Sequence, residues 1–295
     1  MPTIAAVDLG KTRCRLVVSG ERGQETYADA GAPGLATAGG VETAFAAIVL
    51  LLKQAGTIDG LGVGAAGAWA APEAAAELAR RLTTETRAPV AVASDVVAAH
   101  VGALEGAPGT LLIAGTGAAA LGVDAHSIRL VDGWGPDLGD LGGGSWIGRE
   151  GVRATLRARD GLAGQTALTD AVHAHMAPVP DAVSWLTADI PVARQLATVA
   201  PLVLDAAATG DAVAMGIVAE AVRLLTASAL AASDVSEVAI HGGLTDHGWF
   251  RTQLESSLIS AGRVIVPASG DALHGAALLT HRTDLPHERF VHRAR

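Results

Sequence analysis

Hydrophobic and polar positions in the first part of the chain predict short strands, glycine turns and amphipathic helices. Residues 3–7, 14–18 and 24–28 form short apolar or alternating runs, and turn residues separate them. Short runs of this kind, bounded by glycine, are typical of β-strands. Residues 41–54 carry apolar side chains at helical spacing, and residues 72–86 open with proline and glutamate, as first turns of helices do.

The rest of the chain continues this alternation. Further strands are expected at residues 61–64, 90–93, 111–114, 119–123, 128–131, 238–240 and 264–266. Further helices are expected at residues 96–104, 146–159, 167–175, 192–208, 212–231, 249–261 and 270–279. This order predicts an α/β protein with two sheets.

The chain contains no low-complexity linker, so we place the domain boundary where it crosses over near residues 123–131. This gives an N-terminal domain of residues 1–122 and a C-terminal domain of residues 123–295, whose last helix is free to pack back on the first domain. The charged tail, residues 283–295, is expected to wrap the surface or to fray.

Composition narrows the class of protein. A chain of 295 residues, half of them hydrophobic, is sufficient for one large domain or two medium ones. The formal net charge of −9 argues against nucleic acid or an anionic membrane as partner. Four arginines at positions 149, 153, 157 and 159 have helical spacing and are interpreted as a solvated face. Cys14 is the only cysteine, which excludes a disulfide framework and a cysteine cluster for zinc or iron–sulfur.

The sequence gives no sign of a membrane protein. The apolar run at the N-terminus is stopped by Asp8, and no uncharged apolar run is long enough to span a bilayer. We therefore expect a cytoplasmic protein.

The stretch Gly133–Gly151 carries the strongest functional signal. It combines dense glycine with Asp137, Asp140 and two of the five tryptophans. Glycine is costly to order, so this density indicates sharp turns or a close approach of the backbone to a ligand. The aspartates would let a small polar ligand form both carboxylate and backbone hydrogen bonds. A simple connecting loop remains the alternative.

A glycine turn follows the first predicted strand. Backbone N–H groups of Gly10, Lys11, Thr12 and Arg13 would form a concave site for phosphate oxygens, and the two basic side chains add positive charge. Asp8 would not bind phosphate directly, but it would hold Mg²⁺ through water. The alternative is a hairpin turn with a charged tip.

Two further glycine turns occur later in the chain. Gly115, Thr116 and Gly117 lie between two apolar strands and would cradle phosphate, although hairpins favour glycine anyway. Gly242 and Gly243 lie between a strand and a helix, where a flat ring can approach the backbone and the helix N-terminus favours negative charge. The alternative there is a plain strand–helix connection.

Asp95 is the candidate catalytic residue. It follows a predicted strand and opens a predicted helix, with Ser94 beside it. An aspartate in this position is often an N-cap, and that role is compatible with catalysis. Its carboxylate would accept the proton of a sugar hydroxyl as that hydroxyl attacks phosphorus.

The order of these segments resembles the superfamily of sugar kinases, actin and heat-shock chaperones. Asp8-x-Gly-x-Thr, Ser94-Asp95, Gly115-Thr-Gly and Gly242-Gly243 occur in the order of its phosphate-1, catalytic, phosphate-2 and adenosine segments. Gly133–Glu150 is similar to the BadF/BadG/BcrA/BcrD-type ATPase family, in its N-acetylglucosamine kinase branch. The resemblance extends from Ala5 to about Leu279 and implies two ribonuclease-H-like domains with a cleft between them.

The resemblance also implies residue roles. Thr12, Thr116 and Gly243 would contact ATP, and Asp95 would be the general base and a sugar contact. A further group would bind the sugar, namely Gly133, Trp134, Gly135 and Asp140.

Several positions depart from the family pattern. Lys11 replaces a common glycine, Leu141 replaces a glutamate, and Ala118 and Ala119 replace polar residues. Residues 31–37 lack the asparagine that the family often carries in this loop. Some polar contacts to the sugar are therefore missing or supplied elsewhere.

The sequence thus predicts an ATP- and Mg²⁺-dependent kinase of a hexose or amino sugar, with N-acetylglucosamine and its 6-phosphate as the first choice. Glucosamine or glucose is the alternative substrate, and a homodimer is left open. A sugar-sensing protein without catalysis is a second alternative. The iron–sulfur activators of the same family are disfavoured by the single Cys14.

Overall fold

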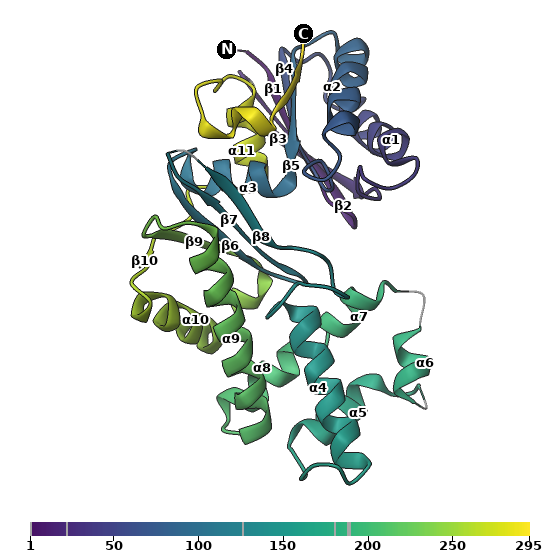
Figure 1. Cartoon of the computed structure of the whole chain (residues 1–295). Helices are drawn as coiled ribbons and strands as arrows, with labels where there is room; N and C mark the ends of the chain where they lie inside the picture. Colours follow the sequence, from purple (N-terminus) through teal and green to yellow (C-terminus); the bar gives the residue numbers. More distant parts are fainter. Residues whose placement is uncertain (1, 22, 126, 180, 188–189) are drawn as a thin grey trace. The chain divides into compact units, whose positions relative to one another are not determined.

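The computed structural model describes residues 2–21, 23–125, 127–179, 181–187 and 190–295. Contacts divide the chain into two compact units, and Figure 1 labels most of their helices and strands. Unit 1 consists of residues 1–108, 123–128 and 267–295, and unit 2 of residues 109–122 and 129–266.

Unit 1 is built on a six-stranded sheet with the order β11-β5-β4-β1-β2-β3. Its strands are β1 (Ile4–Leu9), β2 (Arg13–Gly20), β3 (Gly23–Ala30), β4 (Gly60–Ala65), β5 (Val90–Ser94) and β11 (His292–Ala294). Its helices are α1 (Gly40–Leu52), α2 (Pro72–Thr86), α3 (Asp95–Leu104), α11 (Ala272–Leu279) and the 3₁₀ helix η2 (Pro286–Phe290).

The centre of this sheet fixes where the candidate residues of unit 1 lie. Strands β1, β4 and β5 are parallel, and every residue of β4 and β5 is buried, as expected for strands covered on both faces. In the register, Leu9 pairs with Ala65, and Ala65 pairs with Ser94. The turn after β1 and the start of α3 therefore lie at the same edge of the sheet, one strand apart.

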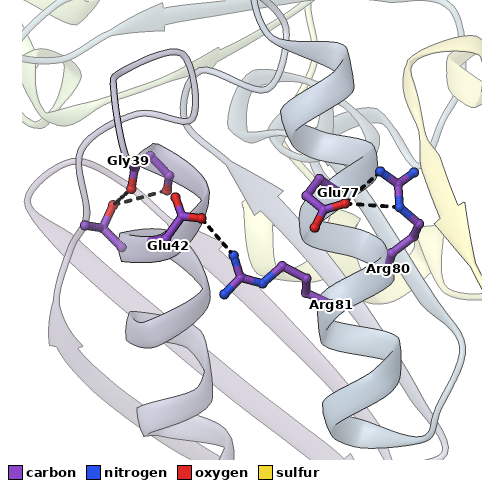
Figure 2. A network of polar contacts seen from close by, with 7 residues as sticks. Gly39, Glu42, Glu77, Arg80 and Arg81 are labelled. Atoms are coloured by element: carbon purple, nitrogen blue, oxygen red, sulfur yellow. Dashed lines mark hydrogen bonds and ion pairs between the residues drawn. The ribbon is translucent and has the colours of Figure 1, made fainter.

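Helices α1 and α2 pack against each other on unit 1. Arg81 on α2 reaches Glu42 on α1 with an Nη1–Oε1 distance of 3.1 Å, as Figure 2 shows. Its guanidinium carbon also lies 4.5 Å from the ring centroid of Phe45. Because these groups are partly exposed, the ion pair stabilises the helix pair only weakly, and the contact with Phe45 adds to it.

Helices α3 and α11 approach closely through two glycines. A Cβ atom at Gly102 would collide with the carbonyl oxygen of Asp271, and a Cβ at Gly275 would collide with that of Ala98. Only glycine allows this backbone contact. Helix α11 thus packs on the first unit, the arrangement that the sequence analysis left open.

The C-terminal tail neither frays nor simply wraps the surface, so that prediction was wrong. Strand β11 pairs antiparallel with β5, which completes one edge of the sheet. The ring of Phe290 stacks on that of Trp69 at a centroid distance of 4.4 Å. His287 is fully buried and forms a 3.0 Å hydrogen bond with His100 on α3. These long-range contacts hold a segment whose local sequence has little structural preference.

Unit 2 is built on a five-stranded sheet with the order β10-β9-β6-β7-β8. Its strands are β6 (Gly109–Ala114), β7 (Ala118–Val123), β8 (Ile128–Asp132), β9 (Glu237–His241) and β10 (Val264–Ile265). Its helices are α4 (Gly144–Arg159), α5 (Leu168–Met176), α6 (Ala182–Leu186), α7 (Val192–Ala197), α8 (Ala200–Ala208), α9 (Ala212–Ala232), α10 (Gly248–Ser260) and the 3₁₀ helix η1 (Gly243–Asp246).

Three details differ from the sequence prediction. The single helix expected over residues 192–208 is divided into α7 and α8, because Pro201 cannot donate an intrahelical hydrogen bond and starts a new helix. The short helix α6 was not predicted. The division between units falls at Gly109, earlier than the boundary expected at residue 122, since β6 and β7 are part of the second sheet.

Helix α9 is a core helix. Within the described residues, it alone has the length and apolar composition that a membrane span requires. Its residues Ala214, Val218 and Leu225 are buried in the hydrophobic core of unit 2, and it packs on α4, α8 and α10. Glu220 and Arg223 form an exposed ion pair on the same helix.

Candidate functional site

The turn between β1 and β2 has the tight backbone that the sequence predicted. The N–H of Gly10 donates to the carbonyl of Arg13 at 2.9 Å, while the side chains of Lys11, Thr12 and Arg13 are exposed. Gly31 packs directly beneath this turn, where a Cβ atom would lie 2.5 Å from the nitrogen of Arg13. The chain after β3 thus supports the turn from below and leaves its charged side chains open to solvent.

Asp8, at the end of β1, is held by an arginine that sequence analysis overlooked. Arg15 faces it across the β1–β2 ladder, and its Nε and Nη2 atoms lie 3.1 and 2.7 Å from Oδ2 of Asp8. Nη1 of the same arginine lies 3.0 Å from Asp271, the N-cap of α11. Arg15 therefore partly neutralises two carboxylates beside the glycine turn.

Asp95 is the first residue of α3, and Ser94 is its N-cap. The Ser94 hydroxyl accepts from the N–H of Val97 at 3.2 Å, and Oδ1 of Asp95 accepts from the N–H of Val96 at 2.9 Å. Burial raises the pKa of the Asp95 carboxyl above its usual range, against the opposing effect of the Val96 hydrogen bond. The carboxylate of Asp8 also raises this pKa, and Lys11 lowers it.

These electrostatic contacts indicate that unit 1 brings the glycine turn and Asp95 together. Gly64 on β4 lies between them: a Cβ there would be 3.5 Å from Cα of Asp95 and 3.8 Å from the carbonyl of Val7. A carboxyl group with a raised pKa, close to a cation and a glycine turn, marks this part of unit 1 as a candidate functional site.

In unit 2 the Gly115-Thr116-Gly117 turn is tied to the N-terminus of α4. The N–H groups of Gly144 and Ser145 donate to the carbonyls of Gly115 and Thr116, both at 2.8 Å. The N–H of Gly115 closes the turn on the carbonyl of Gly117 at 2.9 Å. The Thr116 side chain is exposed.

Asp132 fixes the backbone of the glycine-rich loop Gly133–Gly143, hereafter the glycine loop. The sequence analysis did not single out Asp132. Its Oδ1 accepts from the N–H groups of Gly133 and Asp140 at 2.8 and 2.7 Å, and Oδ2 accepts from that of Leu141 at 2.7 Å. Asp132 has a φ of 63°, which aspartate tolerates better than most residues. An aspartate directly before a glycine-rich loop is a turn signal that the sequence did contain.

The glycine loop places the carboxylate of Asp140 against the Gly115-Thr116-Gly117 turn. Oδ1 of Asp140 lies 3.4 Å from the N–H of Ala118, and a Cβ at Gly117 would be 2.7 Å from Oδ2. Asp140 has a φ of 55°, so its backbone is held in a left-handed conformation. Two segments that were predicted to bind different ligands, phosphate and sugar, are thus adjacent in unit 2.

Other parts of this loop are open to solvent. Gly133 and Gly135 have positive φ values, and the side chain of Trp134 is 76 % exposed. Arg149 on α4 donates from Nη1 to the carbonyl of Pro136 at 2.6 Å. Arg149 therefore fastens the loop to the helix, and its interpretation as part of a solvated face was wrong.

The third glycine turn lies next to the second. Gly242 has a φ of 120°, and a Cβ there would lie 2.9 Å from the nitrogen of Gly115. The 3₁₀ helix η1 follows this turn, stabilised by the Thr245 hydroxyl donating to the Gly242 carbonyl at 2.7 Å. The helix expected at residues 249–261 is α10, which begins one residue earlier, at Gly248.

The residues present fit a water-mediated Mg²⁺ at Asp8. Oδ2 of Asp8 is engaged by Arg15, and within the described chain Oδ1 accepts no hydrogen bond. The described residues contain no cluster of three or more His, Cys, Asp or Glu side chains arranged for a metal. Mg²⁺ commonly keeps several waters and binds through one or two carboxylates plus substrate phosphates, which suits this arrangement.

Cys14 does not offer an iron–sulfur ligand. It is fully buried, and burial raises the pKa of its thiol to about 12, with the carboxylates of Asp8 and Asp29 adding to the effect. A buried protonated thiol is inert.

The comparison with protein families agrees with this architecture. The model of the BadF/BadG/BcrA/BcrD ATPase family matches residues 6–280. The chain belongs to this ATPase family. ATP is accordingly its nucleotide.

Several proteins similar to this ATPase are named as sugar kinases. It is 31 % identical over 121 residues to an N-acetyl-D-glucosamine kinase of Dictyostelium discoideum, a match that spans 40 % of this chain and 38 % of that protein. It is similar to the crystal structure of a candidate N-acetylglucosamine kinase from Chromobacterium violaceum, with a TM-score of 0.76, 26 % identity and coverage of 95 % and 99 % of the two chains.

A second candidate N-acetylglucosamine kinase, from Porphyromonas gingivalis, shares the fold with a TM-score of 0.74 at 19 % identity, over 97 % of this chain and 100 % of that one. The predicted fold class is thus confirmed: a mixed α/β ATPase with two sheets, as in the sugar kinases and actin-like ATPases.

Proposed function

We propose that this ATPase transfers the γ-phosphoryl group of ATP to the 6-hydroxyl of an amino sugar, with N-acetyl-D-glucosamine as its first substrate. The observation that carries the proposal is Asp95, a carboxylate directly after β5 with a raised pKa, within electrostatic reach of Lys11 in the glycine turn. The names of the similar proteins support the choice of sugar.

In the proposed reaction Asp95 is the general base. Its carboxylate takes the proton of the 6-hydroxyl as that oxygen forms a bond to the γ-phosphorus. The bond between the γ-phosphorus and its bridging oxygen breaks, and ADP leaves with the electron pair. A pKa raised by burial brings an aspartate closer to the operating pH and makes it a stronger base.

For nucleotide binding we assign two groups of residues. The first is the turn of unit 1 formed by Gly10, Lys11, Thr12 and Arg13. The second comprises the two adjoining turns of unit 2, formed by Gly115, Thr116, Gly117, Gly242 and Gly243. Mg²⁺, when bound through the waters of Asp8, neutralises charge that develops on the phosphates.

For the sugar we assign Asp140 together with the loop residues Gly133, Trp134 and Gly135. The Asp132 carboxylate fixes the backbone of this loop, so that the Asp140 carboxylate has a defined position. A carboxylate that accepts sugar hydroxyls orients the ring and discriminates against sugars lacking them.

Glucosamine and glucose are the alternative substrates. Ala118 and Ala119 follow the Gly-Thr-Gly turn with apolar side chains, so fewer polar groups fix the ring than the family pattern would supply. We therefore expect slower turnover of these sugars and modest discrimination. The second alternative, a sugar sensor without catalysis, would bind sugar and nucleotide without releasing a sugar phosphate.

The deciding experiment is a phosphoryl-transfer screen with ATP and Mg²⁺ over N-acetylglucosamine, glucosamine, glucose, N-acetylmannosamine and N-acetylgalactosamine. Formation of N-acetylglucosamine 6-phosphate at the highest kcat/KM supports the proposal. Sugar-dependent nucleotide binding with no phosphorylated product would instead favour the sensor.

A further inference from the structure

A cavity lies in unit 2 beside helix α4. It has a volume of about 530 Å³, within the range of small-molecule sites. Helices α4, α6 and α7 enclose it. Its apolar wall includes Val152, Leu156, Trp185, Leu186 and Leu196.

The lining also carries guanidinium groups. Arg149 and Arg153 lie one turn apart on α4 and both line the cavity. Arg153 also pairs with Glu150 at 2.7 Å, and Asp137 contributes one carboxylate to the rim. Each guanidinium has five N–H donors, and within the described residues Arg149 and Arg153 each donate through Nη1 alone. The cavity therefore offers guanidinium donors and a single carboxylate beside an apolar wall.

We propose that this cavity binds an organic anion, namely a carboxylate or phosphate group carried on an apolar body. The anionic head would take the unused donors of Arg149 and Arg153, since planar guanidinium groups match the geometry of both head groups. The apolar body would lie against Trp185 and Leu156. This site lies outside the assigned nucleotide and sugar residues and does not depend on the proposed reaction.

The cavity is mechanically linked to the glycine loop. The same Arg149 that lines it donates to the carbonyl of Pro136, and Asp137 follows directly in the chain. A ligand that holds the remaining N–H groups of Arg149 restricts its rotamers and so keeps the Pro136 hydrogen bond in place. Binding in the cavity thus orders the loop Gly133–Gly143.

Binding is tested with 1-anilinonaphthalene-8-sulfonate, an aromatic anion whose fluorescence rises in apolar sites. We expect one saturable site per chain, from which octanoate and octyl phosphate displace the dye at least tenfold more strongly than uncharged octanamide. Equal displacement by octanamide, or the absence of saturable dye binding, overturns the proposal. The two anions together show whether the carboxylate or the phosphate head is preferred.

Two variants locate the site. Val183→Asp places a carboxylate at the rim on a side chain that is 73 % exposed, and is expected to weaken dye binding about tenfold by repulsion. Its matched control is Leu162→Asp, at a 77 % exposed position outside the lining. Arg153→Gln should also weaken binding, whereas Arg157→Gln on the same helix should not. Wild-type affinity in Val183→Asp and Arg153→Gln would refute the location.

The coupling between the cavity and the loop Gly133–Gly143 can be measured without enzymatic activity. Saturating octanoate is expected to slow amide hydrogen exchange in peptides covering residues 133–143, with no change in peptides from α1. Unchanged or faster exchange in the loop overturns the coupling. Failure of the kinase assay would leave this result intact, so the two proposals are tested separately.

Discussion

The carboxylate of Asp132 holds the backbone N–H of Asp140 at 2.7 Å, across the glycine loop that joins them. The same carboxylate accepts from Gly133 and Leu141, so a single side chain closes both ends of the loop. Asp140, which we assign to the sugar, lies against Gly117. The position of the Asp140 carboxylate therefore depends on Asp132.

Asp132→Ala is therefore expected to raise the KM for the sugar while leaving the KM for ATP nearly unchanged. Losing a carboxylate that accepts several backbone hydrogen bonds, together with the strain of alanine at a φ of 63°, should also lower the free energy of unfolding by roughly 1–3 kcal/mol. Steady-state kinetics and urea denaturation measure both effects. Asp137→Asn, in the same loop but exposed, is the control and should leave stability unchanged. An unaltered sugar KM in Asp132→Ala would contradict the role of Asp132.

Asp95→Asn should lower kcat by roughly two to four decades, the usual loss on removing a general base. The amide oxygen can still accept the Val96 N–H, so the start of α3 should remain folded. ATP binding, measured by calorimetry, should persist. Near-normal turnover would remove Asp95 from the mechanism, and loss of ATP binding would show that the variant disturbs more than the base.

Asp140→Ala is expected to raise the sugar KM far more than the ATP KM. Because the φ of Asp140 is 55°, alanine also introduces backbone strain, and Asp140→Asn is the sharper variant since asparagine tolerates this conformation. If the asparagine variant has a normal sugar KM and the alanine variant does not, the effect comes from the backbone and the carboxylate is not a sugar ligand.

Activity should depend on Mg²⁺ and disappear when divalent ions are chelated, because the metal neutralises charge in phosphoryl transfer. Asp8→Asn should raise the Mg²⁺ concentration needed for half-maximal rate. Asp29→Asn, an exposed carboxylate on β3, serves as the control. Turnover that persists after chelation would exclude a metal from the reaction, and an unchanged Mg²⁺ requirement in Asp8→Asn would exclude Asp8.

The stability of unit 1 should fall in acid because of His287. Burial lowers the pKa of this imidazole to about 3, with the neighbouring His100 adding to the effect. The unfolded chain binds a proton near pH 6.5, and the folded chain does so only near pH 3. The native state is therefore fully stable with respect to this group above pH 6.5, and it loses stability progressively as the pH falls toward 3.

At pH 5 this loss amounts to about 2 kcal/mol relative to neutral pH. Urea denaturation at the two pH values measures it. His287→Gln should lower stability at neutral pH and reduce the additional loss in acid. If the variant and the wild type show the same pH dependence, His287 is not the titrating group.

Residues close together in the sequence determined several strands, turns and helix starts of this protein. Buried apolar runs fixed β4 and β5, glycine between strands fixed the turns at Gly10 and Gly115, and a Ser-Asp pair after a strand fixed the start of α3. These features depend on backbone preferences within a few residues, so they could be identified without the fold. The family followed from their order along the chain.

Tertiary structure decided what depends on residues far apart in sequence. The buried contact of His287 with His100 joins positions 187 residues apart. The tail that contains His287 ends in β11, which forms an edge of the sheet although its local sequence did not predict a strand. Arg149 had the spacing of a solvated helix face, yet the packing of the glycine loop placed a carbonyl within reach of it. A side chain's role follows from its neighbours in space, and helical periodicity only says which residues share a face.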